Sequence, residues 1–169
     1  SDDDPATLVR PFAADAAGTV LGEGGAILVL ESVEHAEARG ATIKAVVSGI
    51  ACTQSIEDNV LTAASAEAIG DAISLALAQA NLNASDIDAV VPMGLGIVGI
   101  DAGESGGLQA ALGAHADTLP RILITPATGN CCAGHGGVQL AVAAQCIATQ
   151  RLLGTPMSLS HVLVITASQ

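Results

Sequence analysis

The sequence contains almost no aromatic side chains, and this constrains its fold more than any other feature. Phe12 is the only aromatic residue among 169, although half of the chain is hydrophobic. Alanine, glycine, valine, leucine and isoleucine must therefore fill the core. Small side chains let helices and sheets approach closely, which favours helices that are packed on several sides. Because only 13% of the residues are charged, we expect part of the apolar surface to face a partner.

The charges are few and mostly negative. Five Lys and Arg residues stand against 17 Asp and Glu residues, which gives a formal net charge of −12. DNA, RNA and anionic membranes are disfavoured as partners, because no basic cluster can displace their counterions. The acidic residues 1–5 are the reverse of a secretory signal. The uncharged stretch 122–150 is interrupted by polar residues and glycines, so we expect a cytoplasmic protein without a membrane span.

The four cysteines do not indicate a metal site or a disulfide. Cys52, Cys131, Cys132 and Cys146 lack zinc-site spacing, and adjacent cysteines such as Cys131 and Cys132 are not a common disulfide pair. We expect reduced thiols, no metal and no cofactor.

Strand-like and helical patterns alternate along the chain. Runs rich in isoleucine, leucine and valine predict buried strands at residues 26–31, 43–50, 87–93, 121–125 and 161–167. Helical spacing predicts helices at residues 33–39, 65–81, 103–112 and 136–150, with Gly40 as the stop of the first. Because the strands are apolar throughout, we expect an α/β fold in which a largely parallel or mixed sheet has helices on both faces.

Residues 10–41, RPFAADAAGTVLGEGGAILVLESVEHAEARGA, follow one continuous pattern. It has an Arg-Pro-Phe entry, a glycine-rich turn, a strand that ends in Glu-Ser, and a short helix of the form E-H-A-x-A-R-G-A. This pattern resembles a segment of the β-ketoacyl synthases, the condensing enzymes of fatty-acid and polyketide synthesis. Ala13 departs from the pattern, because the family usually has Asp there.

The resemblance implies a thiolase-like fold, in which two similar α/β halves stack with helices between two sheets. Residues 1–42 then correspond to the end of the N-terminal ketosynthase half, with its last strand and a short helix. Residues 43–169 correspond to the C-terminal half, incomplete at its end. We expect this half to stack on an N-terminal half, from the same protein or from a split chain. The resemblance also implies a ketosynthase-type homo- or heterodimer and an acyl carrier protein as partners.

The resemblance further implies a catalytic set of two histidines and a lysine, which this chain lacks. The first histidine stands in H-G-T-x-T-P-x-x-D-x-x-E, where this sequence has Met93, then matching Gly94, Asp101 and Glu104. The second histidine and the lysine stand in K-x-x-x-G-H-x-x-x-A-A-G, where Thr125 replaces the lysine and Asn130 the histidine. Asn can donate a hydrogen bond but carries no proton at neutral pH, and Met can do neither. No catalytic residue is therefore expected in this chain.

His135 and Cys132 offer an alternative site. They are three residues apart and would share a helix face, so a Cys-His nucleophile pair is conceivable. We favour a structural role, because thiols and small residues pack well at a helix start and buried thiols are inert. His35 is expected at the surface. His115 and His161 have no acidic or thiol partner at metal-ligand spacing.

Residues 94–99 fit the dinucleotide-binding pattern G-x-G-x-x-G after a predicted strand. Against this reading, we expect that the motif does not open directly into a helix. In addition, the next strand ends in Thr-Pro without an acidic residue for a ribose.

Two function classes remain. The first is a non-catalytic ketosynthase-like subunit, similar to chain-length factors, that acts as the structural partner of an active 3-oxoacyl-[acyl-carrier-protein] synthase. The second is part of a divergent active acyltransferase whose nucleophilic cysteine lies in the N-terminal half. A fragment without activity of its own is a third possibility. We favour the non-catalytic subunit, because Met93, Thr125 and Asn130 occupy the catalytic positions.

Overall fold

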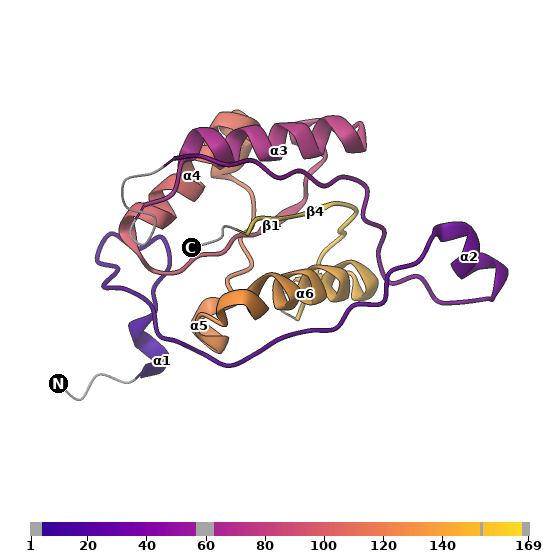
Figure 1. The fold of residues 1–169 in the computed structure, drawn as a ribbon, viewed down its shortest axis with the longest axis horizontal. Helices are drawn as coiled ribbons and strands as arrows, with labels where there is room; N and C mark the ends of the chain where they lie inside the picture. The colour runs from indigo at the N-terminus through magenta and orange to yellow at the C-terminus, as the bar shows by residue number, and fades with distance from the viewer. Residues whose placement is uncertain (1–4, 57–62, 153, 167–169) are drawn as a thin grey trace.

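The computed structural model describes residues 5–56, 63–152 and 154–166. Its centre is a short parallel pair of strands, β1 (Ala89–Val91) and β4 (Val162–Val164). Helices α3 (Ala66–Ala80) and α4 (Val98–Leu112) lie on one side of this pair, and α6 (His135–Thr149) lies on the other (Figure 1). The expected α/β class, with helices on both faces of a sheet, is confirmed.

Alternation along β1 places its residues in two separate core clusters, because successive strand residues face opposite sides. Val90 points toward α3 and α4, where Ile73, Leu77 and Leu108 are buried. Ala89 and Val91 belong to the second cluster, in which α6 contributes Ala143 and Cys146. A third segment runs beside β1, because Val90 forms an isolated parallel bridge with Arg121.

The remaining elements are short. They comprise α1 (Pro5–Leu8), α2 (Val33–Ala38), α5 (Thr125–Thr128), the 3-10 turns η1 (Ala84–Asp86), η2 (Gly113–Asp117) and η3 (Cys132–Gly134), and the antiparallel pair β2 (Arg151–Leu152) and β3 (Thr155–Pro156).

The observed ends of α2 and α3 agree closely with the predicted ends, because a capping residue marks them. The Ser65 hydroxyl accepts a hydrogen bond from the Ala68 N–H at the start of α3, and Asn81 ends the helix in the left-handed conformation. Helix α2 begins after Ser32 in the same way and ends at Arg39, before Gly40 with φ of 69°. Helix α6 runs one residue ahead of the predicted range. Helix α4 begins at Val98, five residues before the predicted start.

Two predicted strands, residues 26–31 and 43–50, are extended but belong to no strand ladder within the described residues. The first segment runs along α5 and α6, and the second runs along α3 (Figure 1). Contact is close, because a Cβ atom added to Gly49 would lie 2.2 Å from the Ala76 carbonyl oxygen. On the other side, a Cβ on Gly22 would lie 1.8 Å from the Thr128 carbonyl oxygen.

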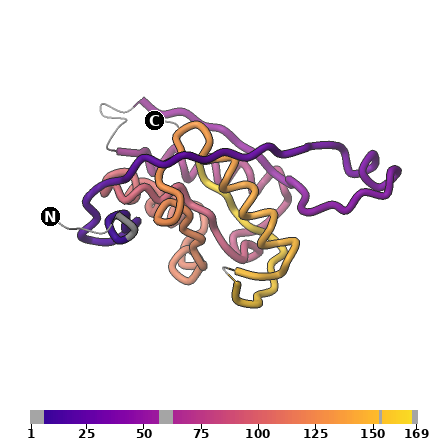
Figure 2. Tube along the Cα trace, turned by 90° about the horizontal axis from the view of Figure 1, so that it is seen from below, coloured from indigo at the N-terminus to yellow at the C-terminus, as the bar shows by residue number. Residues whose placement is uncertain are grey.

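The outer sides of these two segments carry exposed aliphatic residues. Ile27 is 98% exposed and Val29 is 86% exposed on the first segment, and Ile50 is 76% exposed on the second. Figure 2 shows both segments along one side of the body, joined by α2, which projects beyond it. The predicted surplus of apolar surface is therefore concentrated on one continuous strap, residues 18–56.

The other three predicted strands are shorter than expected. Within residues 87–93, only Ala89–Val91 form β1. At residues 121–125, only the bridge at Arg121 forms, and Thr125 already begins α5. At residues 161–167, β4 covers Val162–Val164, and residue 167 lies outside the described residues. None of the helices in the described residues has the length and apolar character to cross a membrane.

Small residues allow α3 and α4 to pack closely, as the composition predicts. A Cβ on Gly103 would lie 2.2 Å from the Ala64 carbonyl oxygen, and one on Gly107 would lie 2.5 Å from Ile69 Cγ2. Gly70 of α3 faces Ala110 in the same interface.

We predict that Gly103→Ala destabilises the protein by about 1–3 kcal/mol, because the backbone of residue 64 cannot move aside without opening the interface. Alanine otherwise stabilises a helix by about 1 kcal/mol relative to glycine. Gly136→Ala is the matched control, because its added Cβ would meet only the Thr166 side chain at 3.4 Å. Chemical unfolding of both variants measures the difference, and equal stabilities would contradict the close packing.

Candidate functional site

The loop that follows β1, residues 93–97, is held by two carboxylates of α4. The Glu104 carboxylate accepts hydrogen bonds from the N–H groups of Met93 and Gly94, both at 2.8 Å. Asp101 accepts bonds from the N–H groups of Leu95 at 3.0 Å and Gly96 at 3.1 Å. Both side chains are buried, so the helix fixes the backbone of the loop at four consecutive residues.

Asp101 also connects this loop to the N-terminal segment. The N–H group of Phe12, which has a φ of 62°, donates to Asp101 at 2.7 Å. The Arg121 guanidinium lies 4.4 Å from the centre of the Phe12 ring, a cation–π distance. Nothing in the sequence pattern placed Phe12 at the site, because its partners are far away along the chain.

The two carboxylates have unusual acidities. Burial raises the pKa of Glu104 to about 7, against the opposing effect of the Gly94 and Met93 N–H groups. Burial also raises the pKa of Asp101, which three backbone N–H groups and Arg121 counteract. Glu104 therefore gains or loses a proton near neutral pH.

This shift makes stability depend on pH. Folded Glu104 keeps its proton up to about pH 7, whereas the unfolded chain releases it near 4.5. The free energy of unfolding should therefore fall by up to about 3 kcal/mol as pH rises from 4.5 to 7, and change little above that.

We predict that Glu104→Gln reduces this slope, although it also weakens one of the two loop hydrogen bonds. The measurement is the free energy of unfolding of both proteins between pH 4.5 and 8. The exposed Glu67→Gln serves as the substitution control. An unchanged slope in the Glu104 variant would show that another group causes the dependence.

The second loop at the site begins at Thr125, the residue that the sequence pattern predicts to replace a family lysine. Its hydroxyl donates to the Met93 carbonyl oxygen at 2.7 Å, so residues 93 and 125 are in direct contact. Asn130 is buried, and its side-chain oxygen accepts a hydrogen bond from the Cys132 N–H at 2.9 Å. Its backbone pairs with Val20 and Gly22 of the extended segment. The structure thus brings Met93, Thr125 and Asn130 to one region, formed by the ends of β1 and α5.

His135 lies at the same place, but not as the partner of Cys132. Its ring contacts the Thr125 hydroxyl and the Cys131 N–H, whereas the Cys132 thiol faces the Asn130 carbonyl. Cys132 lies in the 3-10 turn η3, and His135 begins α6, so the two residues do not share one regular helix face.

The glycine-rich stretch 94–99 does open into a helix, contrary to the prediction, because α4 begins at Val98. A phosphate at this helix start would need free backbone N–H groups. Asp101 and Glu104 already occupy those of residues 93–96, so the glycine-rich turn does not offer them to an anion. The loop is therefore a carboxylate-bound turn.

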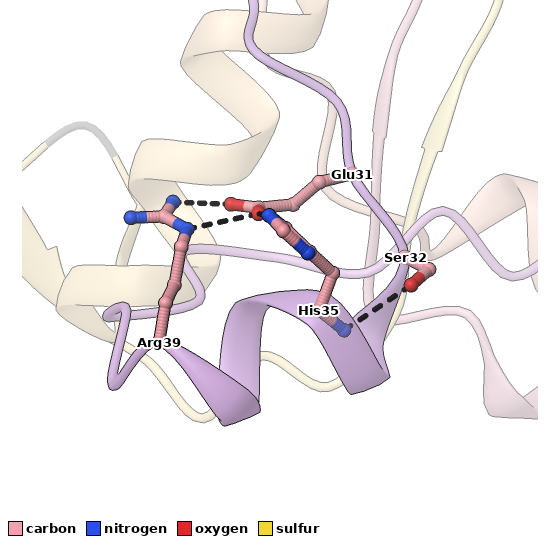
Figure 3. A network of polar contacts seen from close by, with 4 residues as sticks. All are labelled: Glu31, Ser32, His35 and Arg39. Carbon is pink, nitrogen blue, oxygen red and sulfur yellow. Dashed lines mark hydrogen bonds and ion pairs between the residues drawn. The ribbon is translucent and has the colours of Figure 1, made fainter.

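The other histidines have local roles. His35 is exposed on α2, where Glu31 pairs with it and with Arg39 (Figure 3). Its surface location is as predicted. His115 and His161 contact the backbone carbonyls of Ile87 and Asp86. Within the described residues, no group of three or more His, Cys, Asp or Glu side chains could hold a metal ion.

A cavity of about 260 Å³ adjoins the site and was not predicted from the sequence. Val9, Val20 and Leu21 form one wall, and residues 125–129 form the other. The cavity depends on the N-terminal segment folding back against α5, for which the local pattern gives no signal.

Comparison with known proteins shows which family has this sequence. The family model described as "Beta-ketoacyl synthase, C-terminal domain" matches residues 44–157, which is more than half of the chain. A putative polyketide beta-ketoacyl synthase 1 of Streptomyces halstedii is 35% identical over 150 residues, covering 89% of this chain and 36% of that protein. Nodulation protein E of Rhizobium leguminosarum bv. trifolii is 44% identical over 107 residues, covering 63% of this chain and 26% of that protein.

Solved structures show the same fold. A type II PKS acyl-carrier protein in complex with its ketosynthase bound to the hexaketide (AntDE:AntF) gives a TM-score of 0.76 at 26% identity, covering 89% of this chain and 36% of that one. The ishigamide ketosynthase/chain length factor gives 0.73 at 30% identity, covering 88% and 35%. The chain spans about a third of the length of these relatives, as expected for a C-terminal half with the thiolase fold. The chain belongs to the β-ketoacyl synthase family, through its C-terminal domain.

Proposed function

We propose that this chain is the C-terminal half of a non-catalytic, ketosynthase-like subunit of polyketide or fatty-acid biosynthesis. In this role it pairs with an active 3-oxoacyl-[acyl-carrier-protein] synthase and helps to set the length of the product. Residues 1–42 complete the N-terminal half of the same subunit, and residues 43–169 form the C-terminal half. Acyl carrier protein is the third partner, and the assembly is cytoplasmic.

The state of the three degenerate positions supports this proposal. Where the family pattern has histidine, lysine and histidine, the chain has Met93, Thr125 and Asn130, all buried. The Thr125 hydroxyl donates to the Met93 carbonyl of the neighbouring loop, and the Asn130 side-chain oxygen accepts from the Cys132 N–H of its own loop. None of the three can provide the paired imidazoles that would stabilise a developing enolate.

The strap at residues 18–56 supports the expectation that the rest of an N-terminal half covers this side of the chain. Extended backbone with exposed aliphatic residues is a surface on which another strand or sheet can pair. Ile27, Val29 and Ile50 would be covered there.

The names of the relatives favour the alternative function. The Streptomyces relative is called a synthase, and at 35% identity this chain could be part of an active acyltransferase whose nucleophilic cysteine lies in the N-terminal half. An activity assay separates the two.

We predict that the full-length protein alone does not decarboxylate malonyl-acyl carrier protein, and that condensation requires an added ketosynthase partner. In this pair, Asn130→Ala should change kcat by less than about threefold, because removal of an oxyanion donor typically costs a hundredfold or more. Substituting the nucleophilic cysteine of the partner is the control and should abolish activity. Decarboxylation by the protein alone would instead identify an enzyme.

We also predict that Ile27→Glu destabilises the full-length protein, in which the rest of the N-terminal half covers this position. A carboxylate at this position would be buried without a partner, which should lower the stability by several kcal/mol. The exposed Asp71→Ala on α3 is the control. Thermal unfolding of both variants measures the effect, and an unchanged melting temperature would mean that the strap faces solvent.

A further inference from the structure

His135 is a buried imidazole that the proposed function does not use. It is the first residue of α6 and is 1% exposed. A buried imidazole is costly unless its polar atoms have partners. Its contacts include the Cys131 N–H, 3.5 Å from Nδ1, and the Thr125 hydroxyl, 3.4 Å from Nε2, and the Met93 carbonyl oxygen is also near the ring.

These contacts fix the position of the ring proton. Because the Cys131 N–H can only donate, Nδ1 must be the acceptor and carries no proton. The proton of the neutral ring is then on Nε2 and points to Thr125 Oγ1. The Thr125 hydroxyl is free to accept it, since its own hydrogen is donated to the Met93 carbonyl oxygen at 2.7 Å.

We propose that His135 is a positioning residue, locked as the Nε2–H tautomer, which completes a chain of hydrogen bonds from the Cys131 N–H through Thr125 to the Met93 carbonyl. The chain ties the start of α6, the start of α5 and the loop after β1 to one another. Since Glu104 holds the N–H of Met93 and Thr125 holds its carbonyl, both sides of this residue are fixed.

Electrostatics favour the neutral ring that this chain requires. Burial lowers the pKa of His135, and the nearby Met93 carbonyl only partly opposes this effect. A second ring proton would be placed on Nδ1, facing the Cys131 N–H, and would break the first bond of the chain.

Threonine at position 125 and histidine at position 135 depend on each other in this geometry. The family pattern has lysine at position 125 and alanine at position 135, whereas this chain has threonine and histidine. A longer side chain at position 125 would extend beyond Thr125 Oγ1, which both the Met93 carbonyl and the His135 ring face. Lysine at 125 and histidine at 135 therefore compete for the same space.

The tautomer is measured directly by ¹⁵N NMR of the histidine-labelled full-length protein at pH 7. We expect His135 to show a protonated Nε2 and an unprotonated Nδ1. A ring with the proton on Nδ1, or a positively charged ring, would overturn the proposal. This result is independent of whether the subunit is catalytic, so its failure is distinct from failure of the proposed function.

Matched variants test separately the hydrogen bonds of Nδ1 and Nε2 of His135. His135→Asn keeps an acceptor for the Cys131 N–H, and His135→Gln keeps a donor that can reach Thr125. We expect His135→Ala to lower the melting temperature by about 5 °C or more, and each amide to recover part of this loss. His115→Ala, at a half-buried histidine that contacts the Ile87 carbonyl, should leave the Cys131 and Met93 amide signals unchanged.

Two double variants test the chain itself. Thr125→Val should lower the melting temperature by about 2–4 °C in the natural background and by less together with His135→Ala, where only the bond to the Met93 carbonyl is left to lose. Thr125→Lys should be less destabilising in the His135→Ala background than alone. Additive effects in both pairs would overturn the proposal.

Discussion

The site depends on two carboxylates of one helix that bind the backbone of the preceding loop. Asp101 and Glu104 receive the N–H groups of four consecutive residues, and without them this buried turn would have unpaired donors. Asp101 also binds the Phe12 N–H, so the same helix turn anchors the N-terminal segment. Because both acids bind backbone N–H groups, they hold the loop whichever side chain residue 93 carries.

Local signals predicted the helices well, because their ends are determined by neighbouring residues. Ser65 and Asn81 mark the ends of α3, and Arg39 and Gly40 end α2. The start of α4 was placed too late, because Gly99 and Gly103 weaken the helical pattern while tertiary contacts stabilise the helix. The extended segments were recognised as strand-like, but ladder formation depends on what lies beside them.

The candidate site was predicted only in part. The family pattern identified Met93, Thr125 and Asn130, and the structure places them together. The contacts of His135 were not predictable, because spacing suggested Cys132 as its partner while the fold presents Thr125 and the Cys131 backbone. The cavity beside α5 was missed for the same reason, since it forms between segments that are more than 100 residues apart.

Helix α2 projects beyond the body and contributes one buried side chain, Ala36. Its fold is maintained locally, by the Ser32 cap and the pairing of Glu31 with Arg39. Helix α2 connects the two extended segments, but it takes no part in the contacts that pack them against α6 and α3. The joint at α2 therefore connects the two segments without holding the body together.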